Sequence, residues 1–208
     1  MRLEKAYLFW GNYIYPFIAF PLLTWLWYRE TGPHFAILVM GLPVVYGYVI
    51  PGIGTNILKK WRFRGPLMLG DFLLHQGFIY GSTMGLALYL GFFPKNGGEP
   101  LALLGNIART AIGLAFIGWS YDTLAVRHGM IEIYNGPWKR GAGPEAIVAH
   151  SAPLCYSVLG ASYAVIATWG YQRLVQQGDV NSLWWLFLAG FLIISVTSSV
   201  PYLLLEQS

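Results

Sequence analysis

The stretch LWWLFLAGFLIISVTSSVPYLLL, at Leu183–Leu205, carries no charged residue from one end to the other. About 20 apolar residues are enough for an α-helix to cross the hydrocarbon core of a bilayer. Five other stretches have a similar length and character. The expected spans are Tyr7–Tyr28, His34–Ile53, Pro66–Phe93, Leu101–Val126, Ile147–Arg173 and Leu183–Leu205. The sequence therefore predicts an all-α, polytopic membrane helix bundle of about six transmembrane helices, with residues 1–208 as one domain.

The composition agrees with this fold class. The chain has 208 residues, of which 56% are hydrophobic and only 11% are charged. A soluble domain carries about 25% charged residues, so this chain has too little polar surface to face water on all sides. Its 9 Trp and 14 Tyr are typical of proteins whose aromatic rings lie at the headgroup level. The apolar run after Met1–Lys5 is too long for a signal-peptide core, which predicts a retained first helix.

Basic residues gather on one side of the predicted bundle. That side receives Arg2, Lys5, Lys59, Lys60, Arg62, Arg64, Arg127, Lys139 and Arg140, whereas the other receives Arg29, Lys95 and Arg173. Loops rich in Lys and Arg stay in the cytoplasm, so we expect both chain ends to be cytoplasmic. This topology explains the net charge of +4 without a nucleic-acid partner. The cluster at Lys59–Arg64 is also suited to attract anionic lipid headgroups.

Ionisable residues within the spans are candidates for function, because a charge is costly to hold inside a membrane. Asp71 and His75 lie four residues apart, which predicts a shared face of the third helix. The predicted topology brings several polar residues near the cytoplasmic face. These are Asn12, Asp71, His75, Asp122, Glu145 and His150. This convergence is the most specific functional signal in the sequence.

Each of these residues also has a purely structural explanation. Asp71 and Glu145 fit first-turn acids that are stabilised by the helix dipole, and Asp122 fits a partner for a loop arginine. A single histidine in a membrane protein is more often hydrogen-bonded than catalytic. Cys155 is the only cysteine, and one thiol makes neither an internal disulfide nor a zinc site. We therefore expect no metal.

The segment Tyr121–Arg140 combines acids, bases, aromatic rings and turn residues. This density predicts a cap over a lipid-facing pocket, and an ordinary amphipathic loop on the bilayer surface is the alternative. The candidates for substrate contact are Asn12, Trp119, Tyr121, Tyr134 and Trp138.

Part of this region resembles the small membrane-integral lycopene cyclases and related isoprenoid-modifying enzymes. In that family a helix ends on an Asp, followed by a small residue, basic residues, a Gly and an aromatic; a turn, a Pro and paired acids then open the next helix. The matching residues here are Asp122, Ala125, Arg127, Gly129, Tyr134, Gly141, Pro144 and Glu145. The match covers about 25 residues, and Ala146 stands where the family has its second acid, with His150 one turn further on. The resemblance implies a distant relative that acts on a polyprenyl or similarly apolar substrate.

The leading hypothesis is a membrane enzyme of the cyclase or isomerase type that rearranges an isoprenoid or sterol-like lipid. Protonation of an alkene or epoxide gives a carbocation, which aromatic rings stabilise. Asp122 and Glu145 are the expected acids, with Asp71, His75 and His150 as base or orienting groups. No cofactor is required for this chemistry.

Other functions stay open from sequence. A non-catalytic cofactor-binding subunit or a small transporter could use the same polar cluster. Haem would need two histidines at matched depth, which His75 and His150 meet. A cluster that only stabilises the bundle is a further alternative.

Overall fold

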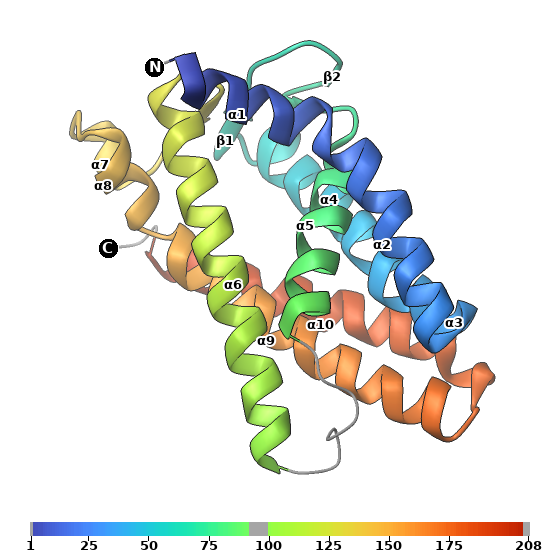
Figure 1. The fold of residues 1–208 in the computed structure, drawn as a ribbon. Helices are drawn as coiled ribbons and strands as arrows, with labels where there is room; N and C mark the ends of the chain where they lie inside the picture. Colours follow the sequence, from blue (N-terminus) through green and yellow to red (C-terminus); the bar gives the residue numbers. More distant parts are fainter. Residues whose placement is uncertain (1, 92–99, 206–208) are drawn as a thin grey trace.

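The computed structural model describes residues 2–91 and 100–205, and it is mostly helical (Figure 1). The helical elements are α1 (Arg2–Tyr13), α2 (Tyr15–Thr31), α3 (Pro33–Ala36), η1 (Ile37–Gly41), α4 (Leu42–Gly52), η2 (Ile53–Ile57), α5 (Gln76–Gly91), α6 (Pro100–Arg127), α7 (Gly136–Lys139), α8 (Pro144–Ala149), α9 (Ala152–Gly170), η4 (Tyr171–Gln176), η5 (Val180–Ser182) and α10 (Leu183–Leu205). The short strands are β1 (Trp61–Phe63), β2 (Met68–Leu69), β3 (Phe72–Leu73) and β4 (Ile131–Ile133).

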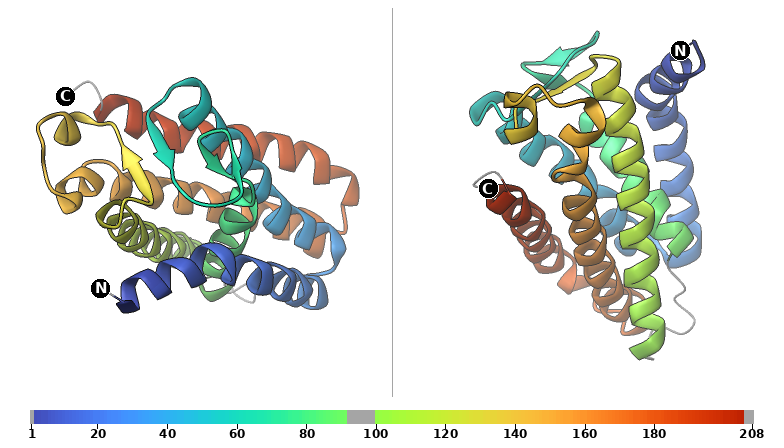
Figure 2. Two further views of the ribbon diagram at one scale, coloured as in Figure 1. Left: turned by 90° about the horizontal axis from the view of Figure 1, so that it is seen from above. Right: turned by 90° about the vertical axis from the view of Figure 1, so that its left-hand side faces the viewer.

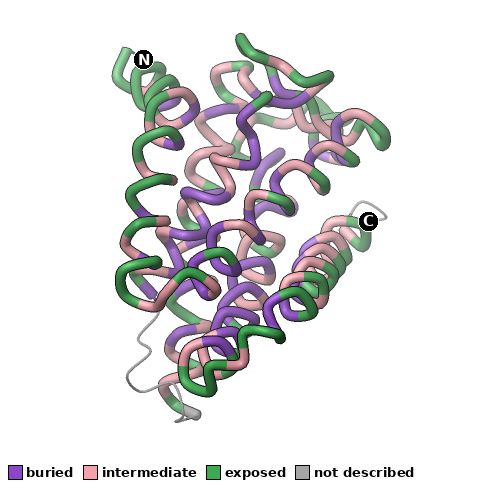
Figure 3. Tube along the Cα trace, turned by 90° about the vertical axis from the view of Figure 1, so that its right-hand side faces the viewer, coloured by how far each residue is buried: buried purple, intermediate pink, exposed green. Residues whose placement is uncertain are grey.

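Four helical segments among the described residues are long and apolar enough to cross a membrane. They are Pro33–Ile57, Leu101–Arg127, Pro144–Gln176 and Val180–Leu205. Exposed positions recur along α1, α2 and α10 (Figure 3). Many of the exposed side chains are large and apolar, such as Trp184 at 73% and Ile112 at 68% exposure. Such a surface is suited to lipid rather than water, and these helices indicate a membrane protein.

The first predicted span, Tyr7–Tyr28, is divided between two helices. The chain leaves the helical pattern at Ile14, just before Pro16 near the start of α2. Proline lacks the backbone N–H that would continue the hydrogen-bond ladder. The remaining helix, α2, has 17 residues. At about 1.5 Å per residue it is slightly shorter than the roughly 30 Å hydrocarbon core.

The third predicted span, Pro66–Phe93, is wrong in its first part. Residues 68–73 form a hairpin of β2 and β3, and α5 begins only at Gln76. Gly70 turns the chain at a φ of 65°, a conformation that glycine adopts without strain. The Asn56 Oδ1 atom then accepts a hydrogen bond from the Asp71 backbone N–H at 2.7 Å. Asp71 and His75 therefore do not share a helix face, and the end of this prediction, at 92–93, lies outside the described residues.

The long helices pack around α5. This helix contacts α2, α4 and α6, while α6 packs along α9, and α9 packs on α10 (Figures 1 and 2). The main core includes Leu42, Leu159 and Ile166, which are 0–2% exposed. Gly160 of α9 faces the backbone of Ala111 in α6 with no room for a side chain. Small residues of this kind let membrane helices approach closely.

One end of the bundle carries a small β-structure, here called the sheet end. Strand β1 pairs antiparallel with β4, so that Arg62 lies opposite Glu132. The start of α1, the end of α6 and the helices α7 and α8 lie at the same end (Figures 1 and 2). A second apolar cluster joins these parts through Leu8, Phe63 and Ile131. The sheet end thus closes the bundle above the region where Asp122 lies.

Candidate functional site

Two cavities adjoin each other inside the bundle. The first, here called the aromatic cavity, has a volume of about 270 Å³ and lies among α1, α2, α5, α6 and α9. The second, here called the sheet cavity, has a volume of about 220 Å³ and lies among α4, η2, α9, α10 and the strands β1 and β4. The residues common to both walls are Phe63, Tyr80, Asp122, Tyr156 and Leu159.

Asp122 is the one carboxylate, among the residues that the structure describes, that lines either cavity. It comes from the last turns of α6 and is half-buried. The Tyr156 hydroxyl donates a hydrogen bond to its Oδ2 atom at 2.9 Å. The described parts of the chain give Asp122 no ion pair. Tyr80 and Tyr156 both line the two cavities together with Asp122. The hydrogen-bond partner of this carboxyl is therefore a phenol rather than a cation.

A glycine in α6 makes this arrangement possible. Gly118 lies one turn before Asp122, and a Cβ atom there would collide with the Tyr156 ring. Because Gly118 has no side chain, the Tyr156 ring fits against α6 and its hydroxyl reaches Asp122. The close contact between α6 and α9 thus places the Tyr156 hydroxyl beside Asp122.

Aromatic side chains dominate the wall of the aromatic cavity. They are Tyr7, Trp10, Tyr15, Phe63, Tyr80, Tyr121 and Tyr156. Gln76 and Thr83 add polar atoms from α5, and within the described residues no Lys or Arg lines this cavity. A ring-lined wall without a cation is suited to an apolar ligand and to transient positive charge.

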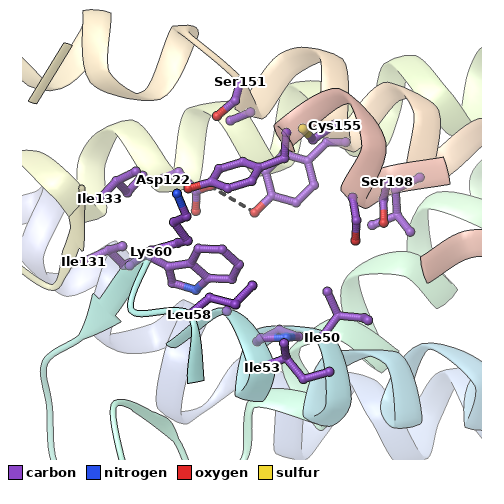
Figure 4. A pocket seen from close by; sticks show the side chains of 18 of the residues that line it. Ile50, Ile53, Leu58, Lys60, Asp122, Ile131, Ile133, Ser151, Cys155 and Ser198 are labelled. Carbon is purple, nitrogen blue, oxygen red and sulfur yellow. Dashed lines mark hydrogen bonds between the residues drawn. The ribbon is translucent and has the colours of Figure 1, made fainter. Parts of the chain in front are cut away.

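The sheet cavity is more polar. Lys60 enters it from the segment before β1, Ser151 and Cys155 from the start of α9, and Ser198 from α10 (Figure 4). The hydroxyl groups of Tyr46 and Ser198 are hydrogen-bonded to each other at 2.9 Å. Asp122 therefore lies between a cavity that has a lysine in its wall and one that has none.

Two of the three predicted catalytic carboxylates, the expected acid Glu145 and the expected base or orienting group Asp71, lie in surface ion pairs. Asp71, in the β2–β3 turn, has its Oδ2 atom 2.7 Å from the Lys59 Nζ atom, and the hydrogen bond from Lys59 lowers the pKa of this carboxyl. Glu145 is exposed, with its Oε1 atom 2.5 Å from a guanidinium nitrogen of Arg127. Arg127 also pairs with Glu4. Neither Asp71 nor Glu145 lines either of the two cavities.

The predicted histidines are hydrogen-bonded to different main-chain carbonyls. The Nε2 atom of His75 donates to the Asn12 carbonyl oxygen at 2.7 Å, and its buried ring packs against Tyr13. His150 donates from Nε2 to the Leu205 carbonyl oxygen at 3.1 Å. Neither imidazole lines the two cavities, so the arrangement does not fit a haem held between them. The described residues also contain no group of three or more His, Cys, Asp or Glu residues that could hold a metal ion.

The residues predicted to contact a substrate also divide into those that line a cavity and those that do not. Tyr121 lines the aromatic cavity and donates a hydrogen bond to the Asn12 Oδ1 atom. Tyr134 packs on Trp138 at the sheet end and donates to Glu132 instead. Trp119 is 43% exposed. Of this predicted set, Tyr121 alone lines either cavity.

Sequence reasoning missed Tyr80 and Tyr156, which line both cavities with Asp122, and Gln76, which lines the aromatic cavity. It followed formal charge, whereas these side chains are neutral. A usable signal was present, because a tyrosine or glutamine within an apolar helix must find a partner for its polar atoms.

Fold and site together define a helical membrane protein with an internal, largely apolar site that contains one carboxyl group. Comparison of the chain with family models, with curated proteins and with solved structures found no match.

Proposed function

We propose that this chain is a membrane enzyme that rearranges an isoprenoid or sterol-like lipid by proton transfer, as a cyclase or isomerase, with Asp122 as the proton donor. One observation carries the proposal. Asp122 lines two ring-walled cavities, accepts a hydrogen bond from a phenol and makes no ion pair within the described residues. An apolar environment favours the neutral form of a carboxyl group, which is the form that can donate a proton.

Asp122 and the lipid together account for every bond that forms or breaks in the proposed reaction. The Asp122 carboxylic acid transfers its proton to one carbon of a C=C bond, whose π electrons form the new C–H bond. The other carbon becomes a carbocation, and a second double bond of the same lipid can attack it to close a ring. Loss of a proton from a neighbouring carbon to the Asp122 carboxylate restores a double bond and the acid. The net change is an isomerisation.

The aromatic cavity is the better place for the cation. Ring faces attract positive charge, and seven aromatic residues line this cavity, namely Tyr7, Trp10, Tyr15, Phe63, Tyr80, Tyr121 and Tyr156. Lys60 lies in the wall of the sheet cavity instead, where a second positive charge would be repelled. We therefore place the reacting double bond in the aromatic cavity and the remaining hydrocarbon in the sheet cavity.

The proposal keeps the topology expected from sequence, with about six spans and both ends in the cytoplasm. The sheet end carries Lys59, Lys60, Arg62 and Arg64 around β1, which supports a cytoplasmic position for it. Of the residues that carry the resemblance to lycopene cyclases, we assign a chemical role to Asp122 alone. Glu145 is paired with Arg127 and is not proposed as an acid.

Turnover in heavy water tests the proposal. Purified protein in lipid vesicles is incubated in D₂O with squalene, geranylgeraniol or lycopene, and the lipids are analysed by mass spectrometry. We expect an isomer of one probe that carries deuterium on carbon, and we expect Asp122→Asn to abolish it while Glu145→Gln keeps it. Full deuterium incorporation by Asp122→Asn would exclude this mechanism. A probe that is bound and recovered unchanged would favour a binding subunit or transporter.

A further inference from the structure

Gln76 is a buried polar side chain whose oxygen has no hydrogen-bond partner among the described residues. It begins α5 and is 4% exposed. Its side chain lines the aromatic cavity. Among the residues that the structure describes, nothing donates a hydrogen bond to its Oε1 atom. A buried acceptor that is left unsatisfied costs free energy, so such groups generally mark a missing partner.

Three hydroxyl groups in the wall of this cavity already donate hydrogen bonds to other acceptors. Tyr15 donates to the Ser82 carbonyl oxygen at 3.2 Å. Tyr121 donates to the Asn12 Oδ1 atom, and Tyr156 donates to Asp122. Since each hydroxyl has one proton to donate, these groups do not satisfy Gln76 without losing an existing bond. A molecule in the cavity that carries a hydrogen-bond donor would supply the missing partner of Gln76 Oε1.

We infer that the aromatic cavity binds a lipid alcohol, whose hydroxyl group donates a hydrogen bond to Gln76 Oε1 while its hydrocarbon body lies among the aromatic rings. An anionic headgroup such as a phosphate does not fit, because the partial negative charge of the amide oxygen repels it. Within the described residues, the wall of this cavity also lacks the basic side chains that phosphate requires.

The position of Gln76 fixes how the alcohol lies. Gln76 and Tyr80 are four residues apart and share a face of α5, about 6 Å along the helix axis. Tyr80 and Tyr156 line the same cavity, and Tyr156 donates to Asp122. The hydroxyl group therefore lies about one helical turn from the level of the acid. This inference depends on the proposed function only for the reaction that follows binding, and binding itself is measurable without turnover.

Competition between matched probes tests the inference. The full chain in detergent micelles is loaded with radiolabelled geranylgeraniol, which is then displaced by the unlabelled alcohol or by its methyl ether. The ether keeps the hydrocarbon and the oxygen but cannot donate. One hydrogen bond is consistent with an effect of about 10-fold, so we expect the alcohol to compete at about 10-fold lower concentration than the ether.

Substitutions test whether Gln76 causes the preference for the alcohol over the ether. In Gln76→Leu the alcohol and the ether should differ by less than about 2-fold, because the acceptor is gone. Gln172→Leu, a half-buried glutamine of η4 that lines neither cavity, should keep the 10-fold preference. Gln76→Met gives a second variant of similar length if Gln76→Leu unfolds. If both variants unfold, the ratio of the competing concentrations of alcohol and ether in the unchanged protein tests the inference.

Three outcomes overturn the inference: equal competition by alcohol and ether in the unchanged protein, no binding of the alcohol, or a preference that Gln76→Leu retains. Equal competition would mean that water satisfies the amide. Asp122→Asn should bind the alcohol with the same preference. A preference without any turnover would contradict the proposed function alone, and turnover without a preference would contradict this inference alone.

Discussion

Asp122 in the bundle interior and Glu145 at the sheet end are both carboxylates near the same end of the molecule, but their partners differ in kind. Glu145 is 60% exposed, and its Oε1 atom lies 2.5 Å from an Arg127 nitrogen. Asp122 lies between two cavities and accepts a hydrogen bond from the Tyr156 phenol. An adjacent cation favours the charged carboxylate, whereas apolar surroundings favour the neutral acid. The partner of a carboxyl group, and not the residue type, therefore distinguishes a carboxyl suited to donate a proton from one held in a structural ion pair.

A cation introduced beside Asp122 should remove this distinction. Tyr156→Lys is expected to hold Asp122 in its charged form and to lower turnover about 10²- to 10⁴-fold, the usual range for loss of a general acid. Tyr156→Phe removes the phenol without adding a charge, and we expect a loss of about 10-fold. Initial rates with the probe that the unchanged protein converts provide the measurement. If Tyr156→Lys were as active as Tyr156→Phe, the absence of a cation would not be what makes Asp122 an acid.

The second prediction concerns the glycine that admits Tyr156. Gly118→Ala places a methyl group in the Tyr156 ring. We expect a loss of about 1–3 kcal/mol in the free energy of unfolding, which is typical of overpacking, together with reduced turnover. The thermal midpoint of the purified protein and its rate per folded molecule would report the two effects.

Gly113→Ala is the matched control on the same helix. A Cβ atom at Gly113 meets nothing within 4 Å, so alanine should be neutral or stabilise α6 by about 0.5–1 kcal/mol. Equal destabilisation by both substitutions would show that glycine matters here for helix flexibility and not for the position of Tyr156.

Much of the fold was predictable because hydropathy records burial in lipid. The predicted bounds Leu183–Leu205 are those of α10, and Leu101–Val126 differs from α6 by one residue at each end. The hairpin of β2 and β3 was not predictable in the same way. It depends on the backbone turn at Gly70 and on a hydrogen bond from the Asp71 backbone to Asn56, 15 residues earlier, and an average over side-chain hydropathy registers neither.

The candidate site was predictable only in part. Asp122 attracted attention as a charge within an apolar stretch, and it is the predicted acid that lines the cavities. Its partner Tyr156 is 34 residues away on another helix. That contact depends on the packing of α6 against α9 at Gly118. A count of charged residues contains no information on such packing, so Glu145 and Asp122 look equivalent in the sequence.

The smallest expected effect comes from an acid at the sheet end. A hydrogen bond from Tyr134 lowers the pKa of Glu132, and Arg64, whose guanidinium lies 2.6 Å from Glu132 Oε1, acts in the same direction. Because the pKa is lower in the folded protein than in the unfolded chain, the stabilisation is complete above the ordinary glutamate pKa. It is lost as the pH falls through the folded-state pKa.

Glu132→Gln should therefore lower the thermal midpoint at neutral pH, and its difference from the unchanged protein should shrink toward about pH 3 as the pH falls through the lowered folded-state pKa. The shift should be small, since partly exposed ion pairs contribute about 0–1 kcal/mol. Thermal midpoints of both proteins between about pH 3 and pH 7 provide the measurement. Subtracting one curve from the other cancels the contributions of Asp71 and the remaining acids. Turnover per folded molecule should not change, because Glu132 lines neither cavity. A difference between the two curves that persists undiminished at low pH would mean that Glu132 stabilises β1 and β4 through packing and not through its charge. The contrast between Glu132 and Asp122 would then depend only on where the two carboxylates lie.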